Sequence, residues 1–282
     1  MNFMGGQGSG KKELTAKYSV ELGYSFDTTL GNNLSFLKNA VMNQDYDAVI
    51  IIDGGEGLGK STIGQQVAVM LDIDGVIDEK KQKAFTPQSF MEKVTTLPKF
   101  KAVIYDEARR GLDRRKFGTS ASTNILDMLA ECRQRNLFLI IIMPSFYDMD
   151  MNVSVWRSRA LIHVTGEWSG LDEKGEIPLR PLKRGTFRFY NEAGKKELYT
   201  NDFLRKKYSY PYVKNLSFDG RFSSHFPGDY TLYKKLKSES IKDFHKKKDK
   251  FSCPVCNMNY ERKLKDGRFK CRRGHYWGDV EK

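Results

Sequence analysis

Eight consecutive residues, Gly54-Gly-Glu-Gly-Leu-Gly59-Lys60-Ser61, have the types and spacing needed to bind phosphate groups. They match the pattern G-x-x-x-x-G-K-[S/T], in which backbone N–H groups surround the phosphates and the lysine reaches the outer two. The hydroxyl of the last residue binds Mg²⁺. The sequence therefore predicts an ATP and magnesium site with these nucleotide-binding residues: Gly54, Gly55, Glu56, Gly57, Leu58, Gly59, Lys60, Ser61 and Thr62.

A similar run near the N-terminus lacks one of these features. Residues 5–12 repeat the glycine and lysine spacing, but Lys12 stands where the magnesium-binding hydroxyl should be. No apolar strand precedes the run. We interpret it as a flexible N-terminal segment.

Two acids follow a second apolar run, Val103-Ile-Tyr-Asp106-Glu107, about 45 residues after the glycine-rich loop. We expect Asp106 to hold the magnesium together with Ser61, and Glu107 to orient and deprotonate the attacking water. Taken alone, an apolar run that ends in two acids is as often a helix cap as a site. After the phosphate-binding loop, the pair indicates hydrolysis of the γ-phosphate.

Two arginines and a serine flank a third apolar run, Leu137–Met143. Arg133 or Arg135 is a candidate to stabilise transition-state charge on the γ-phosphate of a neighbouring subunit. Ser145 follows the run and is a candidate sensor of the phosphate. The alternative is that the arginines belong to an ordinary helix surface.

Three of the four cysteines lie near the C-terminus, with a histidine four residues after the last. Three thiolates and one imidazole, from Cys253, Cys256, Cys271 and His275, supply the four tetrahedral ligands that zinc prefers. Four protein ligands leave no open position, which indicates a structural site, and the module resembles a zinc ribbon. We expect Cys132 to be a small buried side chain and His163 to be a core histidine.

The elements that position these residues alternate between strand and helix. Apolar strands are expected at 48–52, 102–105, 137–143 and 160–164, and helices after the loop, at 87–97 and at 122–135. Such alternation predicts an α/β fold with three layers and a mainly parallel central sheet. After residue 165 the pattern changes, and 186–190 and 196–199 are candidate edge strands.

The chain of 282 residues, 39 % of them hydrophobic, is long enough for one large domain and a small appendage. We predict an N-terminal extension (1–45), an ATPase domain with a β-rich C-terminal part (46–233), a basic linker (234–250) and a zinc ribbon (251–282). No apolar run approaches the ~20 residues of a membrane span, and the N-terminus lacks a secretory signal, so a cytoplasmic protein is expected.

Positive charge is concentrated in the tail. The whole chain has 48 Lys and Arg against 35 Asp and Glu, whereas residues 234–282 have 16 against 7. Nucleic acid is the natural partner of such a segment, and a solvated, solubilising tail is the alternative. The candidate contacts are Arg109, Arg110, Arg114, Arg115, Lys116, Arg272 and Arg273, of which the first five follow the two acids. A mobile loop or a subunit contact is the alternative for those five.

The order of these motifs resembles that of the additional-strand, RecA-like P-loop ATPases. Within them, residues 45–165 are most similar to the FtsK–HerA branch, which includes viral genome-packaging and zonular-occludens-toxin-like ATPases. The glutamine that often precedes the proline after the third strand in that branch is absent from Met143-Pro144-Ser145. The resemblance implies a homo-oligomer, often a hexameric ring, that couples ATP hydrolysis to moving double-stranded DNA without sequence specificity. It also places the protein in a prokaryotic host or a virus-infected cell.

The predicted function is therefore an ATP-hydrolysing motor that translocates or packages DNA, with ATP, Mg²⁺ and Zn²⁺ as its ligands. An ATP-dependent switch or assembly scaffold with slow turnover is the alternative. A P-loop kinase fits less well, because a kinase has less need of the second acid, Glu107.

Overall fold

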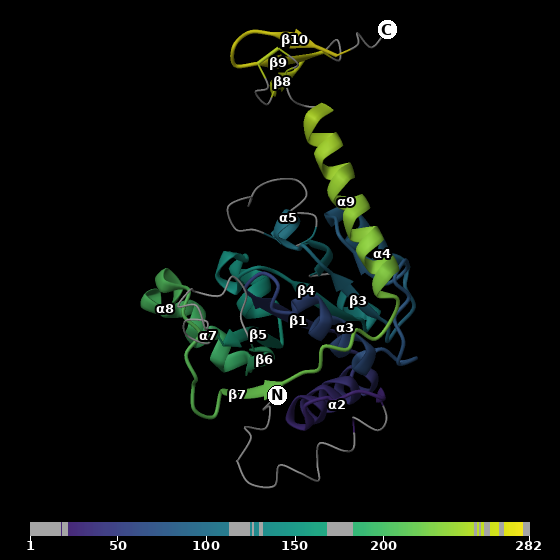
Figure 1. The fold of residues 1–282 in the computed structure, drawn as a ribbon, viewed down its shortest axis with the longest axis vertical. Helices are drawn as coiled ribbons and strands as arrows, with labels where there is room; N and C mark the ends of the chain where they lie inside the picture. The colour runs from purple at the N-terminus through teal and green to yellow at the C-terminus, as the bar shows by residue number, and fades with distance from the viewer. Residues whose placement is uncertain are drawn as a thin grey trace, which may run out of the picture. The chain divides into compact units, whose positions relative to one another are not determined.

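The computed structural model describes residues 18, 22–112, 125, 127–129, 132–167, 183–250, 253, 255–256, 260–264 and 268–278. The chain divides into two compact units, Met1–Tyr230 and Thr231–Lys282. Figure 1 shows the larger unit as a central sheet covered by helices. In the described part of the chain, no helix is long and apolar enough to cross a membrane.

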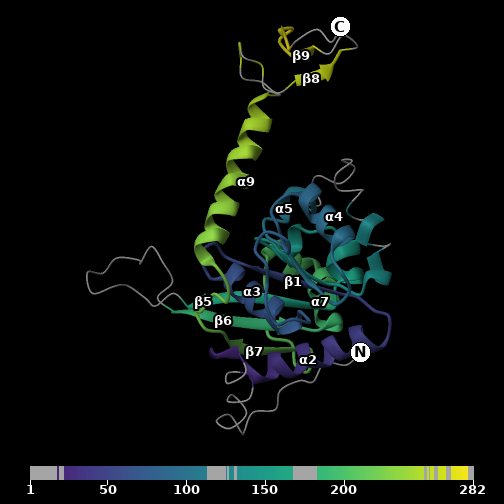
Figure 2. The ribbon, with the colours of Figure 1, turned by 90° about the vertical axis from the view of Figure 1, so that its right-hand side faces the viewer.

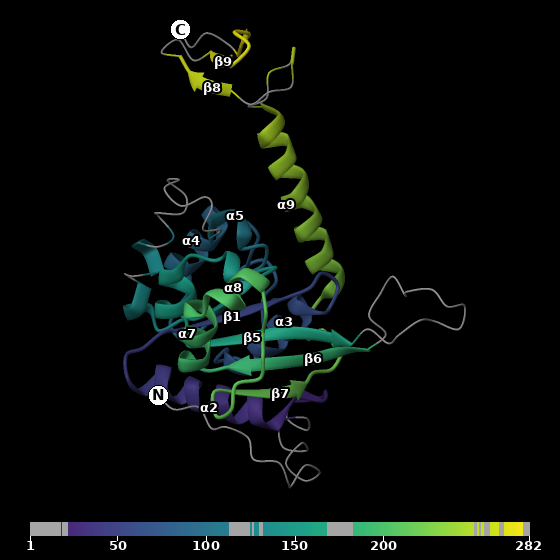
Figure 3. The ribbon, with the colours of Figure 1, turned by 90° about the vertical axis from the view of Figure 1, so that its left-hand side faces the viewer.

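The central sheet has seven strands in the order β2-β3-β4-β1-β5-β6-β7. The first five are mutually parallel, and β6 pairs antiparallel with both of its neighbours. Figure 3 shows β5, β6 and β7 side by side at one edge. The bounds are β1 Ala48–Gly54, β2 Lys83–Ala84, β3 Ala102–Tyr105, β4 Phe138–Ile142, β5 Ala160–Glu167, β6 Lys183–Tyr190 and β7 Ser217–Arg221. The predicted α/β fold with a mainly parallel sheet is confirmed.

Strand residues point alternately to two hydrophobic cores, one on each face of the sheet. In β1, Ile50 and Ile52 belong to one core, whereas Val49 and Ile51 belong to the other. Helices α2 (Thr28–Asn43) and α3 (Lys60–Leu71) cover the first face. The second core includes apolar residues of α4 (Pro87–Thr96) and α7 (Glu192–Thr200). Burial on both faces explains why these strands are uniformly apolar.

Polar side chains fix where several helices begin. Asp27 accepts a hydrogen bond from the N–H of Leu30 at the start of α2, and Thr86 accepts one from Ser89 at the start of α4. Each cap satisfies a backbone donor that the helix itself cannot. The shorter helices are α5 Arg109–Leu112, α8 Asp202–Lys207, the 3-10 helices Cys132–Arg135 and Phe146–Asp148, and the π-helix Asn152–Arg157.

The structure corrects the boundary predicted for the N-terminal extension. Helix α2 lies beside β7 (Figures 2 and 3), and the side chain of Asp27 approaches Gly220 of that strand. Leu30, Leu34 and Leu37 are fully buried in the same core as the central sheet. Residues 28–43 are therefore part of the large domain and not a segment outside it.

Two predicted elements also differ from the structure. Residues 196–199, predicted as an edge strand, lie in α7. Asn191 caps that helix, and the helical spacing of the sequence allows Leu198 and Tyr199 to be buried. The helix predicted over 122–135 is described only in part, with helical residues at 125 and 127–129, and its end is the 3-10 turn 132–135. Residues 5–12 lie outside the described part.

A segment that we call the strap, residues 222–229, follows β7 and is held by α3. The Nε2 atom of Gln65 donates to the carbonyl of Pro227 (2.7 Å), and that of Gln66 donates to the carbonyl of His225 (2.7 Å). Both glutamine side chains are fully buried. The ring of Phe222 occupies space beside Gly59, because a Cβ atom on that glycine would stand 3.2 Å from the ring.

The smaller unit comprises a helix and a three-stranded antiparallel sheet. Helix α9 spans Tyr230–Lys250, the segment for which we predicted a basic linker. The sheet has the order β10-β9-β8, with β8 Tyr260–Lys263, β9 Phe269–Cys271 and β10 Tyr276–Trp277. Strands β8 and β9 pair antiparallel, and residues 265–267 between them lie outside the described residues.

Candidate phosphate-binding and zinc sites

The glycine-rich loop connects the end of β1 to the start of α3, at the carboxyl edge of the parallel strands. Gly54 has a φ of 137°, and a Cβ atom on it would stand 2.3 Å from the carbonyl oxygen of Val164. Gly59 has a φ of 102° and caps α3. Only glycine adopts such conformations without strain, so the sequence pattern follows from the shape of the loop.

Lys60, the first residue of α3, folds back over the loop. Its Nζ atom donates to the carbonyls of Gly54 and Gly55, at 2.8 Å each. The ammonium group is therefore held beside the backbone that surrounds phosphate in this motif. The positive end of α3 adds to the attraction for an anion.

Ser61 and Asp106 meet at the same edge of the sheet. The Ser61 hydroxyl donates to Oδ2 of Asp106 at 3.0 Å, and the carboxylate is 3 % exposed at the end of β3. A hydroxyl and a carboxylate are hard oxygen ligands of the kind that Mg²⁺ prefers. These two residues, predicted as the magnesium pair, are thus brought together by the fold.

Glu107 has an unusual backbone conformation. Its φ is 66°, and its N–H donates to Oδ1 of the preceding Asp106 at 2.9 Å. Positive φ is uncommon for a residue other than glycine and is enriched at functional sites, where neighbouring contacts enforce it. Here Ala108 provides one such contact, since its N–H donates to the carbonyl of Ile142 in β4.

Strand β4 lies between the strand of the glycine-rich loop, β1, and the strand of the two acids, β3. Ser145 therefore follows the strand that runs between Lys60 and Asp106. Its hydroxyl accepts from the N–H of Tyr147 (3.2 Å) and lies 3.2 Å from the hydroxyl of Tyr210. Ser145 therefore lies near the phosphate-binding loop, and its hydrogen-bond partners in the described part of the chain are Tyr147 and Tyr210.

A buried network beside the loop was missed by the sequence analysis. Asp53, fully buried just before Gly54, accepts from the N–H of Phe146 (2.7 Å) and the hydroxyl of Tyr210 (2.5 Å). Its Oδ1 lies 2.8 Å from Nδ1 of His163, and the histidine ring stacks on Tyr210 at 3.6 Å. His163 therefore has a hydrogen-bond partner, as expected, but its side chain is 16 % exposed and belongs to neither hydrophobic core.

Burial of its hydroxyl and the nearby Asp53 carboxylate both raise the pKa of Tyr210. The tyrosine therefore stays protonated and acts as a donor to Asp53. One sequence signal pointed to the network, because an aspartate within the apolar strand 48–54 must find partners when it is buried. Which partners it finds depends on the fold.

Arg133 and Arg135 lie at the amino ends of the parallel strands, whereas the glycine-rich loop of the same chain lies at their carboxyl ends. They precede β4, which runs parallel to β1, and five strand residues separate the two edges by about 17 Å. Arg135 donates to the carbonyls of Thr95 (2.5 Å) and Leu97 (2.8 Å) at the end of α4. Arg133 is exposed, with its guanidinium 5.0 Å from the ring centre of Tyr46.

The basic residues after the two acids are described only in part. Arg109 is exposed and begins α5, and the side chain of Arg110 is not described. Arg114, Arg115 and Lys116 lie outside the described residues, as does the side chain of Cys132. The predicted nucleic-acid contacts in this segment therefore remain predictions.

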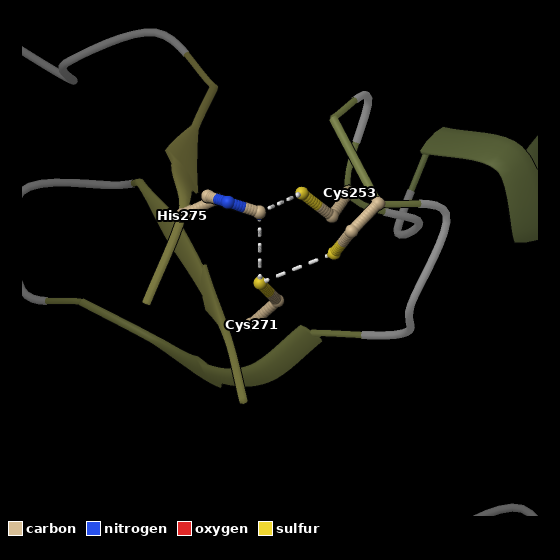
Figure 4. A group of neighbouring side chains, drawn as sticks. Cys253, Cys271 and His275 are labelled. Atoms are coloured by element: carbon tan, nitrogen blue, oxygen red, sulfur yellow. Dashed lines mark hydrogen bonds between the residues drawn. The ribbon is translucent and has the colours of Figure 1, made fainter. Parts of the chain in front are cut away.

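The four predicted zinc ligands gather in the smaller unit (Figure 4), with all ligand atoms within 4.8 Å of one another. Nδ1 of His275 lies 3.4 Å from Sγ of Cys253 and 3.6 Å from Sγ of Cys271, which is 3.6 Å from Sγ of Cys256. A tetrahedron around zinc, with Zn–S about 2.3 Å and Zn–N about 2.0 Å, has edges of about 3.5 to 3.8 Å. The residues present therefore fit zinc.

Opposing effects act on the thiol of Cys271. Burial raises its pKa, but hydrogen bonds from the backbone of His275 and Arg273 and from the two neighbouring thiols lower it, and the net direction is down. The thiolate is the form that binds metal. In the part of the chain that the structure describes, Cys253, Cys256 and Cys271 form no disulfide.

The fold and the phosphate site define a class of protein. A loop of the G-x-x-x-x-G-K-S type after β1, an Asp-Glu pair after β3 and a strand inserted between them form the arrangement that the motif order predicts, that of the additional-strand P-loop fold. The fold class predicted from the motifs is thereby confirmed.

No family model and no curated protein matches the chain. Solved structures of similar fold include the genome packaging NTPase B204 from Sulfolobus turreted icosahedral virus 2 in complex with ATP-gammaS (16 % identity, 53 % of this chain and 94 % of that one, TM-score 0.35). They also include the N-terminal domain of zonular occludens toxin from Neisseria meningitidis (15 %, 67 % and 98 %, 0.38). A third is the VirB11 ATPase of the Brucella suis type IV secretion system (11 %, 67 % and 60 %, 0.31).

Proposed function

We propose that the protein hydrolyses ATP and couples the reaction to movement of double-stranded DNA. The proposal of ATP hydrolysis rests on one observation. Four residues come together at the carboxyl ends of the parallel strands, namely Lys60, Ser61, Asp106 and Glu107. These residues come from the starts or ends of different elements, and the Ser61–Asp106 hydrogen bond joins two of them directly. Such a set suits hydrolysis of a phosphoanhydride.

Each residue has a distinct task in the proposed reaction. The loop N–H groups and Lys60 bind the phosphates and offset their charge, while Ser61 and Asp106 would hold Mg²⁺, which neutralises charge on the β- and γ-phosphates. Glu107 orients a water molecule and accepts its proton as the water oxygen attacks the γ-phosphorus. The bond from that phosphorus to the bridging oxygen breaks, and ADP and inorganic phosphate leave.

The choice of DNA as partner rests on charge and on position in the sequence. Arg109 and Arg110 follow the two acids after one intervening residue, Ala108, so a nucleic acid bound there would be close in the chain to the proposed catalytic residues. Arginine and lysine contacts to phosphates give affinity without sequence readout, which a motor needs on any sequence. The form of this function that we favour is packaging or translocation of DNA by a homo-oligomeric, hexameric ring.

The test is steady-state ATP hydrolysis with double-stranded DNA, with single-stranded DNA and without either. Low salt keeps the phosphate contacts unscreened, and Lys60→Ala is the blank. Stimulation by duplex DNA that disappears in the blank is the expected result. Hydrolysis that depends on Lys60 but is indifferent to DNA would reject the motor and favour a nucleotide-dependent switch or scaffold.

A further inference from the structure

One face of the small C-terminal sheet carries an exposed tyrosine between cations. Tyr276 in β10 pairs with Lys270 in β9, so the two side chains lie on the same face. Tyr276 is 51 % exposed, and its ring centre is 5.4 Å from the ammonium of Lys270 and 5.8 Å from the guanidinium of Arg268. We call these three residues the ribbon face.

The opposite face of the same strands has another task. Phe269 and Trp277 form the neighbouring cross-strand pair, and their ring centres are 5.8 Å apart. Cys271 alternates with Lys270 along β9 and is fully buried as a zinc ligand. The zinc-ligand position of Cys271 and the packing of Phe269 against Trp277 account for that face, whereas the ring of Tyr276 is half exposed on the other.

The charges of this segment specify the chemistry of the partner. Residues 268–278 contain four Lys or Arg and no Asp or Glu, and Arg272 and Arg273 in the turn after β9 are exposed. A polyanion complements such a segment. Among polyanions, the tyrosine favours a single-stranded nucleic acid, because an aromatic ring binds a base by stacking only when the base is not already stacked within a duplex.

We propose that the ribbon face binds single-stranded nucleic acid, with one base stacked on Tyr276 and the flanking phosphates held by Arg268 and Lys270. This inference rests on the proposed function for DNA as the polymer, and it adds a single-stranded segment to the duplex as a second nucleic-acid partner. It concerns a different surface from the phosphate site. Binding by the ribbon face needs no ATP hydrolysis and is measured without nucleotide.

The test compares binding of a labelled single strand and of the matching duplex to the full-length chain by fluorescence anisotropy. Tyr276→Leu is expected to weaken single-strand binding about tenfold and to leave duplex binding within twofold. Tyr276→Trp should retain the single-strand affinity, since it keeps a stacking surface. The matched control is Tyr212→Leu, which removes a tyrosine that is 54 % exposed and has Arg188 5.7 Å from its ring centre.

Because Tyr276 follows the ligand His275, the zinc content of each variant is measured. Arg268→Gln is three residues away from the nearest ligand and tests the same face. It should lower the slope of log affinity against log salt for single strands by about 0.7. Equal weakening by Tyr276→Leu for both nucleic acids, or no effect of either variant on single strands, would overturn the inference in favour of a duplex or a protein partner.

The Lys60→Ala chain separates this inference from the proposed function. It should bind single strands as the unchanged protein does, because Lys60 is outside the ribbon face. A protein that binds single strands through Tyr276 but does not hydrolyse ATP would reject the proposed function alone. A DNA-stimulated ATPase with no single-strand preference would reject the ribbon face alone.

Discussion

Glu107 combines a reactive side chain with a backbone conformation that few residues adopt. The positive φ and the hydrogen bond from its N–H to Asp106 hold the start of the segment after β3 in one geometry. The cost of such a conformation, about 1–3 kcal/mol, persists only where the surrounding contacts enforce it. We infer that this geometry fixes the glutamate relative to the magnesium pair.

Replacing Glu107 with glutamine should abolish turnover and preserve nucleotide binding. Glutamine keeps the size and the hydrogen-bonding capacity of the side chain but cannot accept the proton from water. We expect the rate of ATP hydrolysis to fall by about 10²–10⁴-fold, with unchanged retention of ATP measured by equilibrium binding. An active Glu107→Gln chain would show that another group is the base.

Tyr210→Phe tests the network under the glycine-rich loop. The change removes one donor from the fully buried Asp53 carboxylate, and a buried acceptor that loses a donor costs about 1–3 kcal/mol. The free energy of unfolding, from urea titration, should fall by that amount. Tyr212→Phe, at an exposed tyrosine, should change it by less than about 0.5 kcal/mol. Equal stability of the two variants would contradict the role assigned to the network.

Among the elements, the short helix α7 carries a buried lysine under the π-helix. Lys195 is fully buried, and its Nζ atom donates to the carbonyl and the hydroxyl of Ser158 and to the carbonyl of Ser154. Burial lowers the pKa of Lys195 to about 7, while Glu192 raises it and Arg159 lowers it. The usual lysine value is about 10.4.

This lowered pKa makes stability depend on pH in a predictable direction. Between pH 7 and about 10 the unfolded chain holds a proton that the folded chain has lost, so the free energy of unfolding rises with pH. The slope is at most about 1.4 kcal/mol per pH unit. Lys195→Met should remove this rise in urea titrations at pH 7 and 9. Lys196→Met, at the exposed neighbouring residue, is the control. Identical profiles of unfolding free energy against pH for the unchanged protein and both variants would contradict the assignment of this pH dependence to Lys195.

Zinc should determine whether the three-stranded sheet forms at all. The strands are two to four residues long, and in the described part of this sheet the buried side chains are ligands such as Cys271. Metal binding is therefore expected to supply the folding free energy. A chelator, or Cys271→Ser, should remove a single zinc ion per chain and abolish hydrogen-exchange protection in 253–278. Protection that survives without metal would show that the sheet folds by packing alone.

At the scale of the whole molecule, neither candidate arginine lies near the glycine-rich loop of its own chain. Arg135 is engaged with the end of α4, whereas Arg133 is exposed at the edge opposite its own loop. Arg133→Ala should lower hydrolysis by about 10³-fold or more without changing stability. Arg135→Ala should instead lower the free energy of unfolding by about 1 kcal/mol, measured by urea titration.

Mixing two inactive chains tests the assembly directly. In a mixture of Arg133→Ala and Lys60→Ala chains, some interfaces join an intact loop to an intact arginine. Such interfaces should restore part of the hydrolysis, and an excess of either variant should reduce the recovery. A mixture no more active than its components would argue against a site shared between subunits.

The sequence predicted the structure correctly where a local pattern of residue types determines the local backbone conformation. The glycine spacing of the loop, the apolar strands and the cysteine spacing each predicted what the structure shows. Contacts between distant segments were not accessible, because no local pattern links Asp53 to Tyr210 across 157 residues. The segment 196–199 was predicted wrongly because a capping residue and tertiary burial outweighed an ambiguous short pattern.

The strap has a consequence for where the ATPase domain ends. The last strand of the sheet, β7, stops at Arg221, yet the helix that follows the glycine-rich loop uses two buried glutamine amides to hold residues 223–227. A chain shortened at Arg221 would lose the hydrogen bonds that both amides donate to the strap. The large domain therefore extends beyond its sheet to the end of the strap at Asp229, and α3 is fastened to the segment that leads to the C-terminal unit.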